Sequence, residues 1–146
     1  MRDVHSHMFA ALAIGAAVLD ADNTPLSVDL QGYDAAEILL SIGIGGITFN
    51  GTNKIEFKLT HSDDGVTFDA VAASDMLGVE NVGDGGIIKA LTSAHAAASV
   101  YRCGYKGNRR YLRLLADFSG THGTGTPIAA VVLKMHGFNT PEANQV

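Results

Sequence analysis

The sequence has little sulfur, little charge and no tryptophan, and each shortage excludes a class of protein. A single cysteine, Cys103, excludes an intrachain disulfide and a paired-cysteine metal or redox site. Only 17% of the residues are charged and the net charge is −5, so the chain lacks the basic surface on which nucleic-acid binding depends. Without tryptophan, and with four tyrosines and six phenylalanines, it offers few of the aromatic platforms that carbohydrate-binding sandwiches use.

Long apolar runs are also missing. The longest, Met8–Leu19, has the length of a signal-peptide core and follows Arg2, but Asp3 weakens the basic start and no A-x-A pattern stands near Ala21. The run is too short to span a bilayer, which needs about 20 apolar residues. We therefore expect a soluble protein that is made and kept in the cytoplasm and has no membrane as partner.

Alternating hydrophobicity is the clearest signal that the sequence does contain. In "KIEFKLTH", apolar residues alternate with charged residues and threonine, which is the period of a strand with one buried face. The 146 residues have the length of one domain, and the alternation predicts an all-β fold, an antiparallel β-sandwich or jelly-roll-like single domain. Further strand-like runs, separated by turn residues, cover 27–31, 36–44, 66–71, 99–105, 110–118 and 128–136.

Three segments do not follow this period. Met8–Leu19 is compatible with a helix or an irregular apolar arm, and the alanine-rich stretch 91–99 is typical of a short helix. The segment 78–88 is expected to be a long loop that contacts a partner. The sequence therefore predicts an N-terminal arm (1–24), a β-sandwich domain (25–138) and a C-terminal tail (139–146).

The most legible short motif is "HSDDGVTF", residues 61–68. A calcium-binding EF-hand needs oxygen ligands at alternate positions and a closing glutamate, and none follow Asp64. A sialidase-type aspartate box has one more residue between Asp and Gly, ends in tryptophan and recurs along the chain. Here the motif stands once between two strand-like runs, where Asp side chains bond to nearby amides and Gly65 supplies a positive φ. We predict a hairpin turn rather than a metal or sugar site.

Residues suited to catalysis or metal binding are scattered. The chain has no G-x-S-x-G motif, and Cys103 lies inside a strand-like run. His5 and His7 have a ligand-like spacing, but no third ligand follows at a recognisable distance. The glycine-rich stretch 119–127 precedes a strand and lacks the lysine of a phosphate-binding loop. We expect a protein that is not an enzyme and that holds no cofactor or metal. The carboxylates available for an acid/base pair lie mostly on predicted loops: Asp63, Asp64, Asp69, Asp75 and Asp84.

Four stretches, taken in order, carry a further signal. They are "MRDVHSHM", "LQGYDAAEILLSIG", "FKLTHSDDGVTFDAVAASDM" and "YRCGYKGNRRYLRLLADFSGTHGTGTPIAAVVLKMHG". Together they resemble a family of small structural proteins of tailed bacteriophages, which share an "MRD-H" start, an "SDDG-TF" hairpin and a "Y-GYKG-RYLR" segment. The resemblance covers nearly the whole chain, although "MFAALAIGAAVL" is more apolar than that start leads one to expect.

The resemblance implies a virion component, with a head decoration or cement protein as the expected role. Such a protein is made in the host cytoplasm, binds the outside of the shell formed by the major capsid protein and stabilises the DNA-filled head. A threefold site on the shell favours a homotrimer, and other homo-oligomers are compatible. Under this hypothesis the apolar arm and the loop 78–88 contact the capsid or a neighbouring copy, through Met8, Phe9, Leu12, Ile14, Val18, Leu19, Val79, Val82 and Ile87.

Two other functions are compatible with the sequence. A tail, neck or spike-base component of the virion has the same β-rich character and the same lack of catalytic motifs. A carbohydrate- or cell-surface-binding module comes from a different class, because the SDDG hairpin resembles turns in discoidin-like sandwiches. The loops of this chain are mainly Gly, Thr, Ser and Asn, rather than the aromatic or charged tips usual in such modules.

Overall fold

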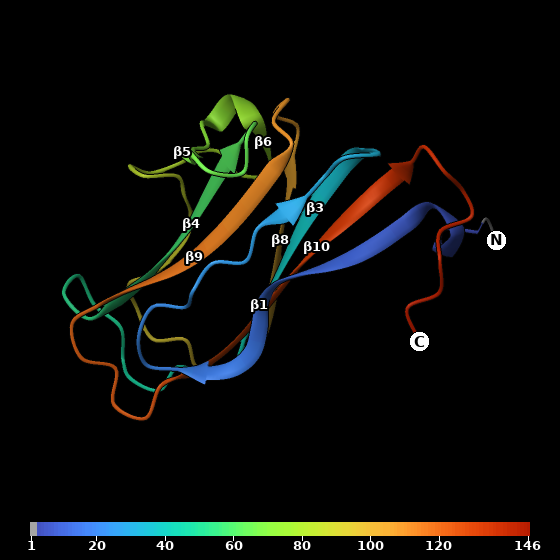
Figure 1. Cartoon of the computed structure of the whole chain (residues 1–146). Helices are drawn as coiled ribbons and strands as arrows, with labels where there is room; N and C mark the ends of the chain where they lie inside the picture. The colour runs from blue at the N-terminus through green and yellow to red at the C-terminus, as the bar shows by residue number, and fades with distance from the viewer. Residues whose placement is uncertain (1–2) are drawn as a thin grey trace.

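The computed structural model describes residues 3–146, which form two packed antiparallel β-sheets (Figure 1). Sheet A has the strand order β1-β10-β3-β8-β6, and sheet B has the order β2-β9-β4-β5, with β7 also pairing with β4. The predicted all-β sandwich is confirmed. The strands are β1 (Met8–Leu19), β2 (Val28–Asp29), β3 (Tyr33–Ile42), β4 (Lys54–Ser62), β5 (Asp69–Ala70), β6 (Met76–Leu77), β7 (Ile87–Leu91), β8 (Ser99–Tyr105), β9 (Tyr111–Ser119) and β10 (Thr126–Gly137).

The strands pair in the nested order of a jelly roll. β1 pairs with β10 and β3 with β8 in sheet A, whereas β2 pairs with β9 and β4 with β7 in sheet B. The chain is therefore one long antiparallel hairpin, rolled so that successive double strands fall in opposite sheets. β5 and β6 are two-residue additions to this plan.

The core lies between the sheets and is built by strict alternation. Along most of β3, β4, β9 and β10 every second side chain points inward and is buried, which is the pattern that the sequence shows most clearly in β4. Burying each large apolar side chain contributes about 1.5–3 kcal/mol, so these four strands supply most of the stabilisation. The most deeply buried of these side chains are Ile38, Ile42, Ile55, Phe57, Leu59, Leu112, Leu114 and Val132.

The N-terminal segment differs from the predicted arm or helix. Residues 8–19 form strand β1, which pairs with β10 along its length and buries Ala13 and Ile14 in the core. The register shifts twice, between Leu12 and Ile14 and again before Ala17, and these irregularities accompany the curve of the strand in Figure 1. The boundary placed at residue 24 therefore does not separate an arm from the sandwich.

Three smaller expectations also need correction. The alanine-rich stretch 92–98 contains no helix. It connects β7 to β8 as an irregular segment. The expected loop 78–88 ends earlier, since Ile87 already begins β7. His5 and His7 lie in a 3₁₀ turn, so they are not alternate residues of an extended chain. The tail 139–146 has no regular structure and runs beside the N-terminal residues, with the Glu142 amide donating to the Ser6 carbonyl.

Two glycine-rich loops close the end of the sandwich opposite the termini. A Cβ on Gly46 would lie 2.0 Å from the carbonyl oxygen of Gly125, so the two backbones meet where only glycine fits. The Gly46 amide also donates to the Thr126 hydroxyl at 3.1 Å. This contact joins the segment after β3 to the segment before β10, and it explains the glycines of the stretch 119–127 without a phosphate ligand.

We predict that Gly46→Ala destabilises the fold by about 2–3 kcal/mol, because the new methyl group would overlap backbone atoms that cannot move independently. Gly51→Ala is the matched control, since nothing lies within 4 Å of a Cβ built there. It should change the free energy of unfolding by less than about 0.5 kcal/mol. Urea unfolding of both variants measures the difference, and equal stabilities would contradict the close approach.

Candidate functional site

The outer face of sheet A is apolar across four strands. Because the even-numbered residues from Ala36 to Ile42 in β3 and from Thr126 to Val132 in β10 are buried, the odd-numbered residues point away from the core. One cross-strand row runs from Leu12 through Val131 to Leu39, according to the strand register. We call this surface the sheet A face, and its members are Met8, Ala10, Leu12, Ala35, Leu39, Val100, Ala129, Val131, Leu133 and Met135.

The outer face of sheet B is different, because charged side chains cover it. β4 presents Lys54, Glu56 and Lys58, and Lys58 forms an ion pair with Asp117 of β9. Lys54 pairs with Glu56 and Lys58 with Asp117, and such a charged face suits contact with water. The two faces of one molecule thus differ in chemistry, and only the sheet A face has the composition of a surface that is covered by a partner.

Two charged residues interrupt the sheet A face, one of them on its central strand β3. Glu37 and Arg102 lie on neighbouring strands β3 and β8, and Arg102 donates to the Glu37 carboxylate at 2.8 Å. Arg102 is 77% exposed, so this pair contributes little to stability. The pair places a charged group between Ala35 and Leu39 on β3 and another opposite Leu39 on β8, so the sheet A face is apolar around an ion pair.

The sequence-predicted contact residues fall into three environments. Met8 and Leu12 lie on the sheet A face, and Val18 is exposed further along β1. Ile14 is buried in the core and cannot contact a partner. The others are half-buried: Phe9 packs over the Lys134 ammonium, and Leu19, Val79 and Val82 pack against the core, while Ile87 lies in β7.

The interior positions of the sheet A face were missed by the sequence reasoning. Leu39, Val131, Leu133 and Met135 belong to runs that read as ordinary strands, "AEILLSIGI" and "IAAVVLKMH". The sequence does contain a signal for them. In these two runs both the odd- and the even-numbered residues are apolar, whereas in β4 apolar and polar residues alternate. A strand that is apolar at nearly every position is typical of burial on both faces.

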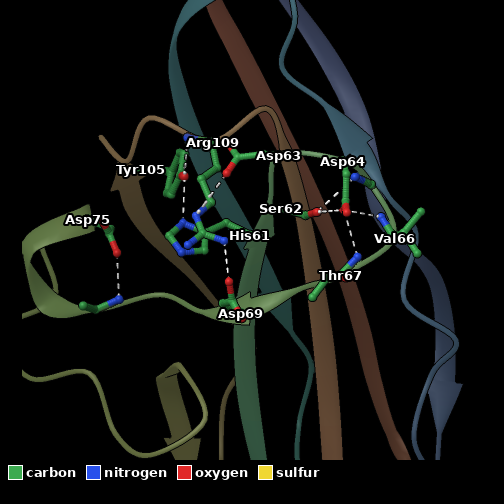
Figure 2. Close-up of polar contacts among 12 residues, drawn as sticks. His61, Ser62, Asp63, Asp64, Val66, Thr67, Asp69, Asp75, Tyr105 and Arg109 are labelled. Atoms are coloured by element: carbon green, nitrogen blue, oxygen red, sulfur yellow. Dashed lines mark hydrogen bonds and ion pairs between the residues drawn. The ribbon is translucent and has the colours of Figure 1, made fainter.

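The SDDG motif is a hairpin turn between β4 and β5, as predicted. Asp64 accepts hydrogen bonds from the Val66 and Thr67 amides, both at 2.8 Å, and Ser62 donates to the same carboxylate (Figure 2). These bonds from the backbone hold the pKa of Asp64 below its usual value. Gly65 has φ +73°, the left-handed conformation that the turn requires. The Asp64 carboxylate is therefore engaged in hydrogen bonds within the turn.

A polar cluster beside this turn braces β4 against the β8–β9 hairpin. His61 Nδ1 lies 2.9 Å from the Tyr105 hydroxyl, which also accepts the Arg109 amide at 3.2 Å (Figure 2). The Arg109 guanidinium forms ion pairs with Asp69 and Asp63. His61 is only 6% exposed, and burial is the main cause that lowers its pKa. The polar groups bond to one another, an arrangement that suits a structural brace.

Cys103 confirms the sequence interpretation of a small buried residue in a strand. It lies in β8, and burial raises the pKa of its thiol to about 11. Within residues 3–146, no three His, Cys, Asp or Glu side chains gather closely enough to hold a metal ion. In the same part of the chain, no helix has both the length and the hydrophobicity needed to cross a membrane.

A groove with a volume of about 670 Å³ lies at the end of the sandwich near the β2–β3 turn and the β8–β9 hairpin. Tyr33, Asp34, Lys106 and Arg110 line part of it. Arg110 makes two hydrogen bonds to Asp29, at 2.8 and 2.7 Å, so its guanidinium is already engaged. The groove is open and mixed in polarity, and could admit a polar small molecule or a peptide side chain.

We predict that the His61 brace makes stability depend on pH. The pKa of His61 is lowered in the fold from its ordinary value of 6.5, so the unfolded chain binds a proton more readily. This contribution is complete above about pH 6.5 and declines as the pH falls toward the lower folded pKa. His61→Asn keeps an acceptor near Tyr105 but cannot titrate. It should therefore lose less stability than the wild type between about pH 7 and about pH 5 in urea unfolding, and equal losses would contradict this role.

No family model, curated protein or solved structure matches this chain. The resemblance to phage structural proteins therefore has no support from a matched relative. What distinguishes the molecule is its geometry: a jelly roll with one apolar and one charged outer face.

Proposed function

We propose that this chain is a non-enzymatic phage virion protein, a head decoration or cement protein that binds the outside of the capsid shell and stabilises the DNA-filled head. Its partners are the major capsid protein and further copies of itself, and its location is the capsid surface. The observation that carries the proposal is the sheet A face, an apolar surface spanning β1, β10, β3 and β8.

The physical requirements of a cement protein agree with this surface. The pressure of packaged DNA pushes capsid subunits outward, and a bridging protein resists it by burying apolar area across their contacts. From strand spacing and rise, the sheet A face covers roughly 400 Å², which is the size at which a surface patch is often functional. Standard interfaces bury about 800 Å² per partner, so the flanking strand edges and loops would contribute the remainder.

The fold is compatible with a virion role, but it does not distinguish that role from others. Jelly rolls are used both by viral capsid proteins and by lectins, and one fold hosts many functions. The decisive feature is therefore the surface chemistry. A sheet face of leucine, valine, methionine and alanine suits a protein partner, whereas sugar sites need converging polar groups.

The test is co-sedimentation of the purified protein with undecorated capsids of its phage, comparing Leu39→Glu with Leu115→Glu. Both leucines lie on outer sheet faces and each has a basic cross-strand neighbour, Arg102 for Leu39 and Lys58 for Leu115. Each variant therefore places one glutamate beside a basic residue, one on the outer face of sheet A and one on the outer face of sheet B. We expect Leu39→Glu to bind at least about tenfold more weakly and Leu115→Glu to bind as the wild type.

Saturation at a fixed ratio compatible with the shell symmetry, with a rise in capsid melting temperature, is the expected wild-type result. Equal capsid affinity of both variants would refute a role for the sheet A face. A wild-type protein that does not bind heads would reject the decoration role, and binding to the tail fraction would favour a tail, neck or spike-base component.

A saccharide-binding module is the second candidate, and the groove near the β2–β3 turn is the observation that favours it. In that case a glycan array would give binding that Asp34→Ala or Lys106→Ala reduces, because both side chains line the groove. The Leu39→Glu variant would bind glycans normally, since Leu39 lies on the sheet A face and does not line the groove.

A further inference from the structure

The β9 edge of sheet B and the β1 edge of sheet A differ in how their backbone groups are covered. β2 pairs with β9 only at Tyr111 and Leu112, and beyond that point side chains cover the β9 edge. Asn23 accepts from the Ala116 amide at 2.7 Å and donates to the Leu114 carbonyl at 3.2 Å, and Asp22 accepts from the Phe118 amide. The fold thus saturates the backbone groups of this edge internally, as monomeric sheet proteins generally do.

Within residues 3–146, the β1 edge receives such cover at one residue. The Gln145 side-chain amide accepts from the Ala10 amide at 2.9 Å and donates to the Ala10 carbonyl at 2.8 Å. A neighbouring strand would offer the same pair of bonds. This contact shows that the free edge has the geometry to receive a strand, and it leaves the remainder of the edge available.

Leu12 and the residues after it are the uncovered part. Backbone groups of alternate residues in a strand point to the same side, so the Leu12 N–H and C=O project away from β10 as those of Ala10 do. Within residues 3–146 no further strand pairs with this edge, and sheet A ends at β1. Leu12 is 54% exposed and Val18 is 62% exposed.

β1 lacks two of the usual protections against edge pairing, charge and proline, and its two register irregularities are the one such device it contains. "MFAALAIGAAVL" has no charge and no proline, the two features that most often blunt an edge strand. Its middle, Gly15 to Ala17, carries only small side chains and is exposed, so a second backbone can approach closely. The charges that give each chain its net −5 lie outside this strand.

We propose that β1 pairs antiparallel with β1 of a second copy, about a two-fold axis near Gly15 that places Leu12 opposite Val18 of that copy. An identical, uncharged strand is its own complement under two-fold symmetry, and the contact closes after two copies. Pairing joins the two A sheets into one continuous sheet and sets the two sheet A faces side by side. The dimer then presents about twice the apolar surface of one copy, in place of the trimer suggested by the threefold argument.

The occupant is a second copy rather than an extended arm of another protein, because the uncovered segment is centred on its own small residues and needs no partner of complementary charge. The interface is narrow compared with standard ones, so a micromolar dimer is expected. This association does not require the capsid, and it can be tested on the isolated protein.

The test is sedimentation velocity of the full chain over a concentration series, with variants that separate backbone pairing from side-chain burial. Leu12→Pro removes the outward N–H while sparing the bonds to β10, a position where an edge strand tolerates proline. Leu12→Ala is the matched control, since it shortens the side chain and keeps the N–H. Val18→Lys places a charge in the paired segment at an already exposed position and provides a second variant should Leu12→Pro not fold.

We expect the wild type and Leu12→Ala to dimerise, and Leu12→Pro and Val18→Lys to raise the dissociation constant at least about tenfold. Thermal melting of each variant at a concentration where the wild type is monomeric confirms that the fold is intact. A wild type that stays monomeric throughout the series, or a folded Val18→Lys that dimerises normally, would overturn the proposal. If the protein is monomeric but binds capsids, only the proposed dimer is refuted. If it dimerises but does not bind capsids, only the proposed decoration role is refuted.

Discussion

Side chains of a β-strand alternate between the two faces of its sheet, so one core can cover only half of a strand that is apolar throughout. β10 imposes this constraint on the whole molecule. Its inward side chains, Ile128, Ala130 and Val132, complete the core together with β3 and the sheet B strands. Its outward side chains, Val131, Leu133 and Met135, have no covering layer within residues 3–146. The stability of the fold and the apolar character of the sheet A face thus arise from the same strand.

The position of β1 follows from this arrangement. β10 lies between β1 and β3, and β1 closes the sheet on the outer side while burying Ala13 and Ile14. The same strand adds Met8, Ala10 and Leu12 to the sheet A face. In the described part of the chain the tail covers the β1 edge at Ala10 alone, so the apolar face continues into an edge that is open beyond that residue. Face and edge are adjacent, so the proposed capsid contact and the proposed pairing of two copies would use neighbouring parts of the molecule.

The polar cluster at the SDDG turn supports the scaffold. Asp64 bonds to the turn amides, His61 bonds to Tyr105, and Arg109 pairs with Asp69 and Asp63. These interactions hold the β4–β5 turn and the β8–β9 hairpin together, at one end of the sandwich. At the opposite end the contact of Gly46 with Gly125 has the same effect. The two ends are fixed, so the sheet A face is presented on a rigid frame.

The sequence by itself determined the fold class, most of the long strands and the SDDG turn, because period-two alternation and turn chemistry are local properties of the chain. It also excluded a disulfide, since there is one cysteine. Only the tertiary structure decided that Met8–Leu19 is an edge strand, that Ile14 is buried, and that Leu39, Val131 and Leu133 share one outer face. The composition of an apolar run is equally compatible with a helix, an extended arm or a strand that is buried on both faces. Which of these forms depends on the strand beside it, and β10 lies more than one hundred residues further along the chain.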